Sequence, residues 1–167
     1  MESFEENKKF GDIFCRYLKT NFGWSYDSID PQKVIIPKGY PDVDVVLISG
    51  QKCPLYLQLK QPLDGCDRYI KFMAKSYLKV FKFCSFKTAI KKAENKYDKN
   101  GKDVSDIIIL LHMHVKNAYL TLHDRDILEK ITSNFRGIYL VSPEQELWKD
   151  GSKKIQSEFV FEIKRAF

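Results

Sequence analysis

The spacing of hydrophobic residues predicts alternating helices and strands along this chain. Near the N-terminus, apolar residues recur every three or four positions, which predicts a helix that closes over 21–23. Ser3 followed by Glu6 is typical of a capping box at its start. A polar loop over 25–32 and a short strand over 34–36 should follow. The inward face of the helix is expected to carry Phe10, Ile13, Phe14, Tyr17 and Leu18.

Two runs of alternating residues predict a β-hairpin. The first covers 43–49, and the short turn SGQKCP separates it from a second strand over 55–61. Successive side chains of a strand point to opposite faces, so this second strand has one aliphatic face and one polar face. We expect the aliphatic face to carry Leu55, Leu57 and Leu59, and the other face to carry Tyr56, Gln58 and Lys60.

The rest of the chain continues the alternation. Helical spacing predicts a long helix from about residue 67 to 84, and a second helix that reaches about residue 96. Strands are expected over 106–115, 117–122, 137–142 and 159–163, with a helix over 123–135. The order predicts one α/β domain over 1–167, with a mixed central β-sheet flanked by helices. The buried stripe of the long helix would be Ile70, Met73, Tyr77, Val80, Phe81 and Cys84.

Composition indicates a folded chain that lies inside the cell. Of its 167 residues, 44% are hydrophobic and 14% are aromatic, which is more than a disordered chain carries. The longest aliphatic run, 107–111, is far too short to span a membrane, and the charged N-terminus lacks the apolar stretch of a signal peptide. We therefore expect a cytoplasmic protein, or a nuclear one if the source is eukaryotic or viral. The cysteines match no zinc pattern and should be free thiols: Cys15, Cys53, Cys66 and Cys84.

Positive charge is concentrated in one segment. The net charge is +6, yet residues 60–102 hold 12 Lys/Arg against 4 Asp/Glu, a local net of +8. Localised positive charge is typical of polyanion binding. Five of these cations recur at helical spacing, over about 21 Å of the expected helix. They could contact a phosphate backbone or simply form a solvated outer face: Arg68, Lys71, Lys75, Lys79 and Lys82.

The hairpin also brings together residue types that suit phosphodiester hydrolysis. Asp42 and Asp44 precede or begin its first strand, and Gln58 and Lys60 share a face of its second strand. Carboxylate and carbonyl-type oxygens are ligands for Mg²⁺, and a neighbouring lysine can orient an attacking water. The alternative is that Asp42 begins a turn after Pro41, and that the polar side chains belong to the solvent face of an exposed strand.

This arrangement resembles the PD-(D/E)xK nuclease superfamily. The motif would read Pro41-Asp42, then Gln58-Leu59-Lys60, with glutamine where the superfamily has an acid, as in Mrr-type relatives. The PD match selects Asp42, whereas the aliphatic strand that follows Asp44 fits the Mrr-like form better, and we lean slightly to Asp44. The resemblance covers about residues 1–115 and implies a restriction-endonuclease-like core, with Mg²⁺ or Mn²⁺ held by an aspartate, Gln58 and the Leu59 backbone carbonyl.

Three further residues are weaker site candidates. Glu6 could contribute to the metal site, as a first-helix glutamate does in some members of the superfamily, although its capping role is favoured. His112 and His114 share a strand face without an evident third ligand, and a structural role explains them better.

The leading hypothesis is thus a metal-dependent endonuclease that acts on DNA, as a homodimer if it cuts a duplex. An inactive nucleic-acid-binding module with the same fold is the alternative. A protein-interaction domain is the third possibility.

Overall fold

The structure, a computed structural model, describes residues 3–36, 43–60, 69–72, 76–80, 83–99, 104–112, 118–120, 130–149 and 152–167. It has two helices, α1 (Phe4–Phe22) and α2 (Phe83–Lys99), among these residues. The described strands are β1 (Asp27–Ile29), β2 (Val45–Ile48), β3 (Leu55–Lys60), β4 (Tyr69–Phe72), β5 (Ser76–Val80), β6 (Ile107–His112), β7 (Ala118–Leu120), β8 (Gly137–Lys149) and β9 (Ser152–Lys164). A short 3-10 helix, Pro31–Lys33, follows β1.

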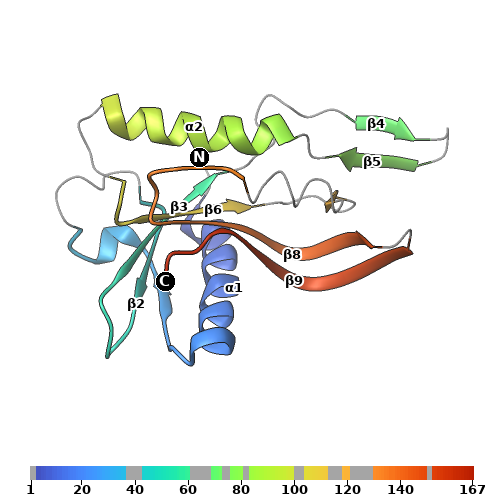
Figure 1. The fold of residues 1–167 in the computed structure, drawn as a ribbon. Helices are drawn as coiled ribbons and strands as arrows, with labels where there is room; N and C mark the ends of the chain where they lie inside the picture. The colour runs from blue at the N-terminus through green and yellow to red at the C-terminus, as the bar shows by residue number, and fades with distance from the viewer. Residues whose placement is uncertain are drawn as a thin grey trace.

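The described strands join in one mixed sheet. β1, β2 and β3 are antiparallel neighbours, while β3, β6 and β8 run parallel to one another. β9 returns antiparallel along the whole of β8. The second half of β8 also pairs with β7, through which the β4–β5 hairpin joins the sheet. Figure 1 shows α1 and α2 on opposite faces of this sheet, and the long β8–β9 hairpin extending away from them. The predicted mixed α/β architecture with flanking helices is confirmed.

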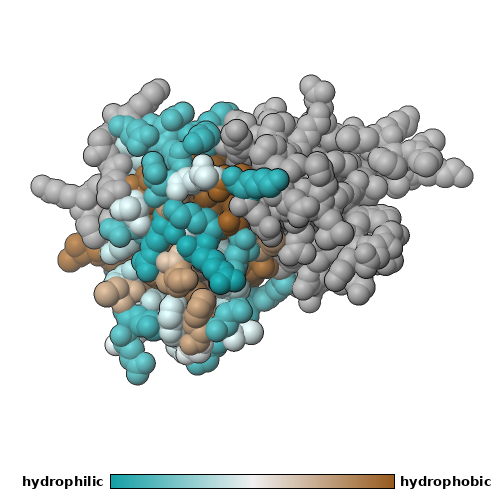
Figure 2. Space-filling view, viewed as in Figure 1, coloured by the Kyte–Doolittle hydropathy of each residue, from teal (hydrophilic) through white to brown (hydrophobic). Residues whose placement is uncertain are grey.

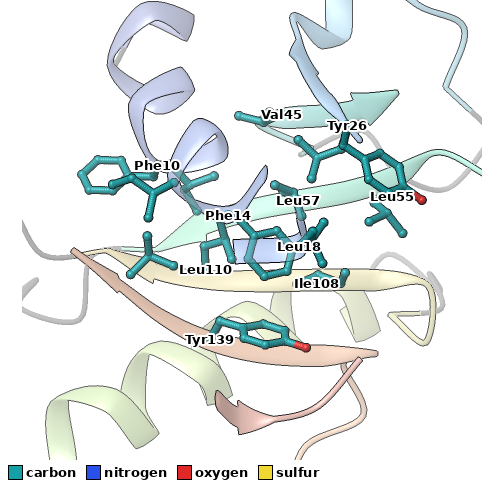
Figure 3. Packing of buried hydrophobic residues seen from close by; sticks show 14 residues of the cluster. Phe10, Phe14, Leu18, Tyr26, Val45, Leu55, Leu57, Ile108, Leu110 and Tyr139 are labelled. Atoms are coloured by element: carbon teal, nitrogen blue, oxygen red, sulfur yellow. The ribbon is translucent and has the colours of Figure 1, made fainter. Parts of the chain in front are cut away.

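Helix α1 forms as its sequence predicts. Its N-terminus has the expected capping box between Ser3 and Glu6, and Gly23 ends it in the left-handed conformation at a φ of 73°. Its apolar face packs on the sheet strands β2, β3, β6 and β8, as Figure 3 shows. The buried residues of this cluster include Phe10, Ile13, Phe14, Leu18, Leu55, Leu57, Leu59, Ile108, Leu110 and Tyr139.

Helix α2 covers the other face of the sheet. Ile90, Ala93 and Tyr97 pack against the β6 positions that alternate with those facing α1. All six residues of β6 are buried, because a helix lies on each side of the strand. The prediction that this strand is buried is therefore confirmed. The residues that β6 turns toward α2 are Ile107, Ile109 and Leu111.

Several predicted elements are wrong. Residues 69–72 and 76–80 form an antiparallel hairpin, not a helix from 67 to 84, because β5 finds a parallel partner in the distant strand β7. Residues 34–36 are not a strand, and Ile35 is 98% exposed. The strand forms instead at Asp27–Ile29, within the expected loop, by pairing with β2. The described part of the expected helix over 123–135, residues 130–135, is not helical.

Candidate functional site

Asp44 lies directly before β2 and is bonded to the neighbouring strand. Its backbone N–H donates to the Leu57 carbonyl oxygen at 2.9 Å. Its carboxylate Oδ2 accepts the backbone N–H of Leu59 at 2.8 Å. Leu59 stands between Gln58 and Lys60 in β3, so this second bond fixes the carboxylate beside the part of β3 that carries both polar residues.

Gln58 and Lys60 share the face of β3 that is turned away from α1. Leu57 and Leu59 belong to the cluster that packs on α1, and strand alternation places the two polar side chains on the opposite face. In the parallel register, Gln58 pairs with Ile109 and Lys60 with Leu111, two residues of the cluster that contains α2. The predicted hairpin and its division into an aliphatic and a polar face are confirmed.

The amide of Gln58 is buried, and its oxygen has no hydrogen bond to the described residues. The residue is only 2% exposed, and its Oε1 has no hydrogen-bond partner among the residues that the structure describes. Leaving a buried polar atom without a partner costs about 1–3 kcal/mol. An amide oxygen in this situation is suited to bind a cation, since it has a free lone pair and few competing waters.

Lys60 completes the group at the end of β3. It is half-buried and lies two residues beyond Gln58 on the same face, about 7 Å along the strand. We name Asp44, Gln58 and Lys60 the Asp44 site. It combines one carboxylate, one amide oxygen and one ammonium group, which suits a hard divalent cation and a phosphate. Among the described residues there is no cluster of three or more His, Cys, Asp or Glu side chains that could hold a metal. Any ion here would therefore depend on amide or backbone carbonyl oxygens, or on substrate.

The other predicted ligands stand differently. Asp42 lies outside the described residues. The Glu6 carboxylate accepts the backbone N–H of Ser3 at 3.1 Å, which is the capping role that the sequence favoured. His112 lies in the core, where its ring packs against that of Phe10 with the centroids 4.6 Å apart and the planes tilted by 40°. Strand alternation puts it on the α1 side of the sheet, away from Gln58. His114 is not among the described residues.

The predicted phosphate-binding stripe of five cations does not lie on a helix in the described residues. Lys71 lies in β4 and Lys79 in β5, where their register partners are Tyr77 and Tyr69. Arg68, Lys75 and Lys82 lie outside the described residues. The helical spacing that aligned these five cations is wrong for the described part of the segment, because its residues alternate with a period of two and form strands. Their proposed role in binding nucleic acid stays a prediction without that geometry.

Sequence reasoning missed the bond that holds Asp44. Alternation can place a carboxylate near a neighbouring strand, but it does not reveal that Asp44 caps the N–H of Leu59. The sequence signal that exists is the short hairpin itself, which limits how far Asp44 can be from β3. The burial of Gln58 was also missed, because it depends on α2, some 30 residues later.

Comparisons of the chain with known protein families, with curated proteins and with solved structures gave no match. None of the helices that the structure describes has the length and apolar character needed to cross a membrane.

Proposed function

We propose that the protein is a divalent-metal-dependent nuclease that hydrolyses phosphodiester bonds of DNA. One observation carries this proposal. The Asp44 carboxylate accepts the N–H of Leu59, and the residues on either side of Leu59 are Gln58, whose buried Oε1 has no hydrogen-bond partner among the described residues, and Lys60. These three groups are those that metal-assisted hydrolysis of a phosphodiester requires: an anionic ligand, a neutral oxygen ligand and a cation near the attacking water.

The order of the elements supports the same reading. The nuclease resemblance implies a leading helix, a hairpin that carries the motif, a helix and then a buried strand. The chain has α1, the β2–β3 hairpin, α2 and β6 in that order, although the β4–β5 hairpin lies between β3 and α2, and β6 runs parallel to β3. This agreement concerns topology, and function rests on the Asp44 site itself.

Each residue of the Asp44 site has a distinct role in the proposal. Asp44 and the Gln58 Oε1 would hold Mg²⁺ or Mn²⁺, with the Leu59 carbonyl and Asp42 as further candidate ligands. When bound, the ion would lower the pKa of a water and neutralise charge on a phosphoryl oxygen. Lys60 would orient the attacking water and stabilise the negative charge of the attacked phosphate. The bond from Leu59 keeps the Asp44 carboxylate in place before any ligand arrives.

The neutral side chain of Gln58 favours a second candidate function. A glutamine ligand carries one negative charge fewer than the usual acid, so the site attracts a cation less strongly. A nucleic-acid-binding module that has the same fold and no catalysis is therefore the alternative. The two candidates differ in their need for metal, since the binding module would bind nucleic acid equally well in a chelator.

The test is nicking of a supercoiled plasmid in Mg²⁺, Mn²⁺ or a chelator. We expect the wild-type protein to nick only with metal. Lys60→Ala should slow nicking by about 100-fold or more, the usual contribution of a group that acts on the reacting proton. Asp44→Asn should slow it at least as much, because it removes the anionic metal ligand. The matched controls are Lys33→Ala and Asp98→Asn, which change exposed residues of the same types.

A readout of metal binding separates the two candidates. Mn²⁺ binding measured by electron paramagnetic resonance should weaken in Asp44→Asn and persist in Lys60→Ala. If the wild-type protein neither nicks DNA nor binds Mn²⁺, the catalytic proposal fails. If it binds DNA in the chelator with all variants alike, the binding module is the correct function.

A further inference from the structure

A second surface lies away from the Asp44 site, where α1 ends. The rings of Phe22 and Trp24 stack with their centroids 4.5 Å apart, at an interplanar angle of 18°. The ring of Phe167 meets both edge-on, at 5.8 Å from Phe22 and 5.0 Å from Trp24. The left-handed turn at Gly23 sets this arrangement, because it reverses the chain between the two stacked residues. We name Phe22, Trp24 and Phe167 the aromatic patch.

Two of the three rings of the aromatic patch are exposed to solvent. Phe22 is 40% exposed and Phe167 is 37% exposed, and they are two of the three exposed large hydrophobic residues within the described part of the chain. The third, Ile35, stands outside the patch. Most of the visible surface of the described residues is hydrophilic, as Figure 2 shows. Aromatic rings gathered at a surface, instead of scattered singly, are typical of a binding site.

Two of these rings have a cation over them. The Lys52 Nζ lies 4.2 Å from the centroid of the Trp24 ring, and the Arg136 guanidinium lies 5.0 Å from that of Phe167. Beside Trp24 is a depression of about 420 Å³ between the end of α1 and the β2–β3 turn. Among the described residues its lining has two lysines, with serine and glutamine side chains and no acidic residue: Lys19, Gly23, Trp24, Ser25, Ser49, Gly50, Gln51 and Lys52.

From this combination we infer that the aromatic patch binds single-stranded nucleic acid. Bases present flat π-faces that stack on exposed aromatic rings, and phosphates are attracted to ammonium groups next to them. Nucleic acid combines both features in one ligand, because each nucleotide carries a negative phosphate and a flat base. Lys19 and Lys52 would meet the phosphates, with the exposed Phe22 and Phe167 rings under the bases. The inference rests on the proposed function only for its choice of nucleic acid as the ligand.

The β2–β3 hairpin links the two surfaces. The turn beside Trp24 is at one end of the hairpin, and the Asp44 site is at the other. Four residues lie between Asp44 and Ser49, and the two positions are about 17 Å apart along an extended strand. A single strand that contacts both surfaces has to span about this distance.

Binding is tested with a fluorescent 20-nucleotide single-stranded DNA in a chelator, so that no cleavage occurs. We expect Phe22→Ala, Phe167→Ala and Lys52→Glu each to weaken binding by about tenfold, the usual effect of losing one stacked ring or one phosphate contact. The matched controls Ile35→Ala and Lys33→Glu, which change exposed residues outside the patch, should stay within about twofold. In a Trp148→Phe background, the remaining fluorescence of Trp24 should be quenched by the DNA.

Three results would overturn the inference. One is unchanged DNA affinity in the three patch variants, and another is Trp24 fluorescence that DNA does not quench. The third is that the patch variants change the sedimentation coefficient of the protein but not its DNA affinity, which would mean that a second copy of the chain covers the patch. Lys60→Ala keeps the two proposals separate. If Lys60→Ala binds DNA normally through the patch, and neither it nor the wild-type protein nicks DNA, the proposed function fails while this inference stands. If the wild-type protein nicks DNA and the patch variants bind DNA as well as wild type, this inference fails while the proposed function stands.

Discussion

The carboxylate of Asp44 accepts the backbone N–H of Leu59 at 2.8 Å, fifteen residues along the chain. This bond joins the start of β2 to the end of β3 at the position where the proposed ligands stand. A carboxylate that is already fixed loses little freedom when it binds an ion, so the site is organised before ligand arrives. The Gln58 oxygen, by contrast, has no hydrogen bond among the described residues to hold it. Substitutions at position 58 are therefore expected to change stability and metal binding separately.

Gln58→Met should stabilise the fold. Methionine has nearly the same length and volume, and it removes a buried oxygen that lacks a partner, so we expect a gain of about 1–2 kcal/mol in the free energy of unfolding. For a chain of this size, that gain raises Tm by about 2–8 °C. The measurement is thermal unfolding without added metal, with Gln51→Met as the exposed control. A lower Tm in Gln58→Met would mean that the Gln58 Oε1 has a hydrogen-bond partner in solution and is not available to bind a cation.

Gln58→Glu should destabilise the fold without metal and strengthen metal binding. A second carboxylate beside Asp44, in a position with 2% exposure, loses hydration and repels its neighbour. The variant should therefore unfold at a lower temperature than wild type in a chelator. An added negative ligand charge favours Mn²⁺, so Tm should rise more steeply with metal concentration than it does in wild type.

The exposed Gln51→Glu variant is the matched control for this charge change. It lies in the hairpin turn and should respond to metal as wild type does. Equal metal responses of Gln58→Glu, Gln51→Glu and wild type would place the cation elsewhere or show that none binds.

Local sequence signals were enough for the hairpin, but not for the rest of the candidate site. The alternation of Leu55, Leu57 and Leu59 with polar residues, together with a short turn, determines both strands and their faces. The burial of Gln58 could not be predicted, since an alternating strand has the same pattern whether its polar face meets solvent or a helix. That choice is made by α2, whose Ile90 and Tyr97 pack on the same face of the sheet.

The predicted helix over 67–84 was wrong for a related reason. Its apolar residues satisfy a helical period, yet Ile70 and Phe72 also alternate with Tyr69 and Lys71 at the strand period. Long-range pairing then decides between the two patterns, since β5 has β7 as a parallel neighbour. The apolar composition of 34–36 favours a strand, although the strand partner of β2 is the more polar Asp27–Ile29.

Glu94 is a buried residue that the sequence did not single out, and we expect it to contribute strongly to stability. It lies on α2 with 7% exposure, and it accepts bonds from the Ser133 hydroxyl and from the Asn134 backbone N–H at 3.1 Å. Glu94→Ala would leave these two donors without an acceptor, at a cost of about 2–4 kcal/mol. Glu94→Gln retains an oxygen and should cost about 1 kcal/mol.

Urea unfolding of both variants measures this difference. Asp98→Ala is the control on the same helix, because Asp98 is exposed. The prediction fails if Glu94→Ala loses no more stability than Asp98→Ala.

The bond between Tyr17 and Glu162 should make stability depend on pH. The Tyr17 hydroxyl donates to the Glu162 carboxylate, and the Arg165 Nε donates to it at 2.7 Å. The Tyr17 bond, followed by that of Arg165, lowers the pKa of Glu162 below its ordinary value of 4.5. A lowered folded-state pKa adds stability above about pH 4.5, and this contribution disappears as the pH falls through the lowered value. Burial and the same bond raise the pKa of Tyr17, so its contribution persists up to the ordinary tyrosine value near pH 10.

Tyr17→Phe should therefore be about 1–2 kcal/mol less stable than wild type at pH 7, because it loses a hydrogen bond to a charged group. At pH 3, below the ordinary value of 4.5, the difference should shrink, because the unfolded chain then binds a proton at Glu162 that the bonded carboxylate of the folded protein resists. Urea unfolding at the two pH values measures both differences. Tyr26→Phe is the matched control, because the Tyr26 hydroxyl donates to the Cys53 carbonyl oxygen at 3.1 Å and to no carboxylate. Its stability deficit should be the same at pH 3 and pH 7, and an equally constant deficit for Tyr17→Phe would contradict a charged acceptor.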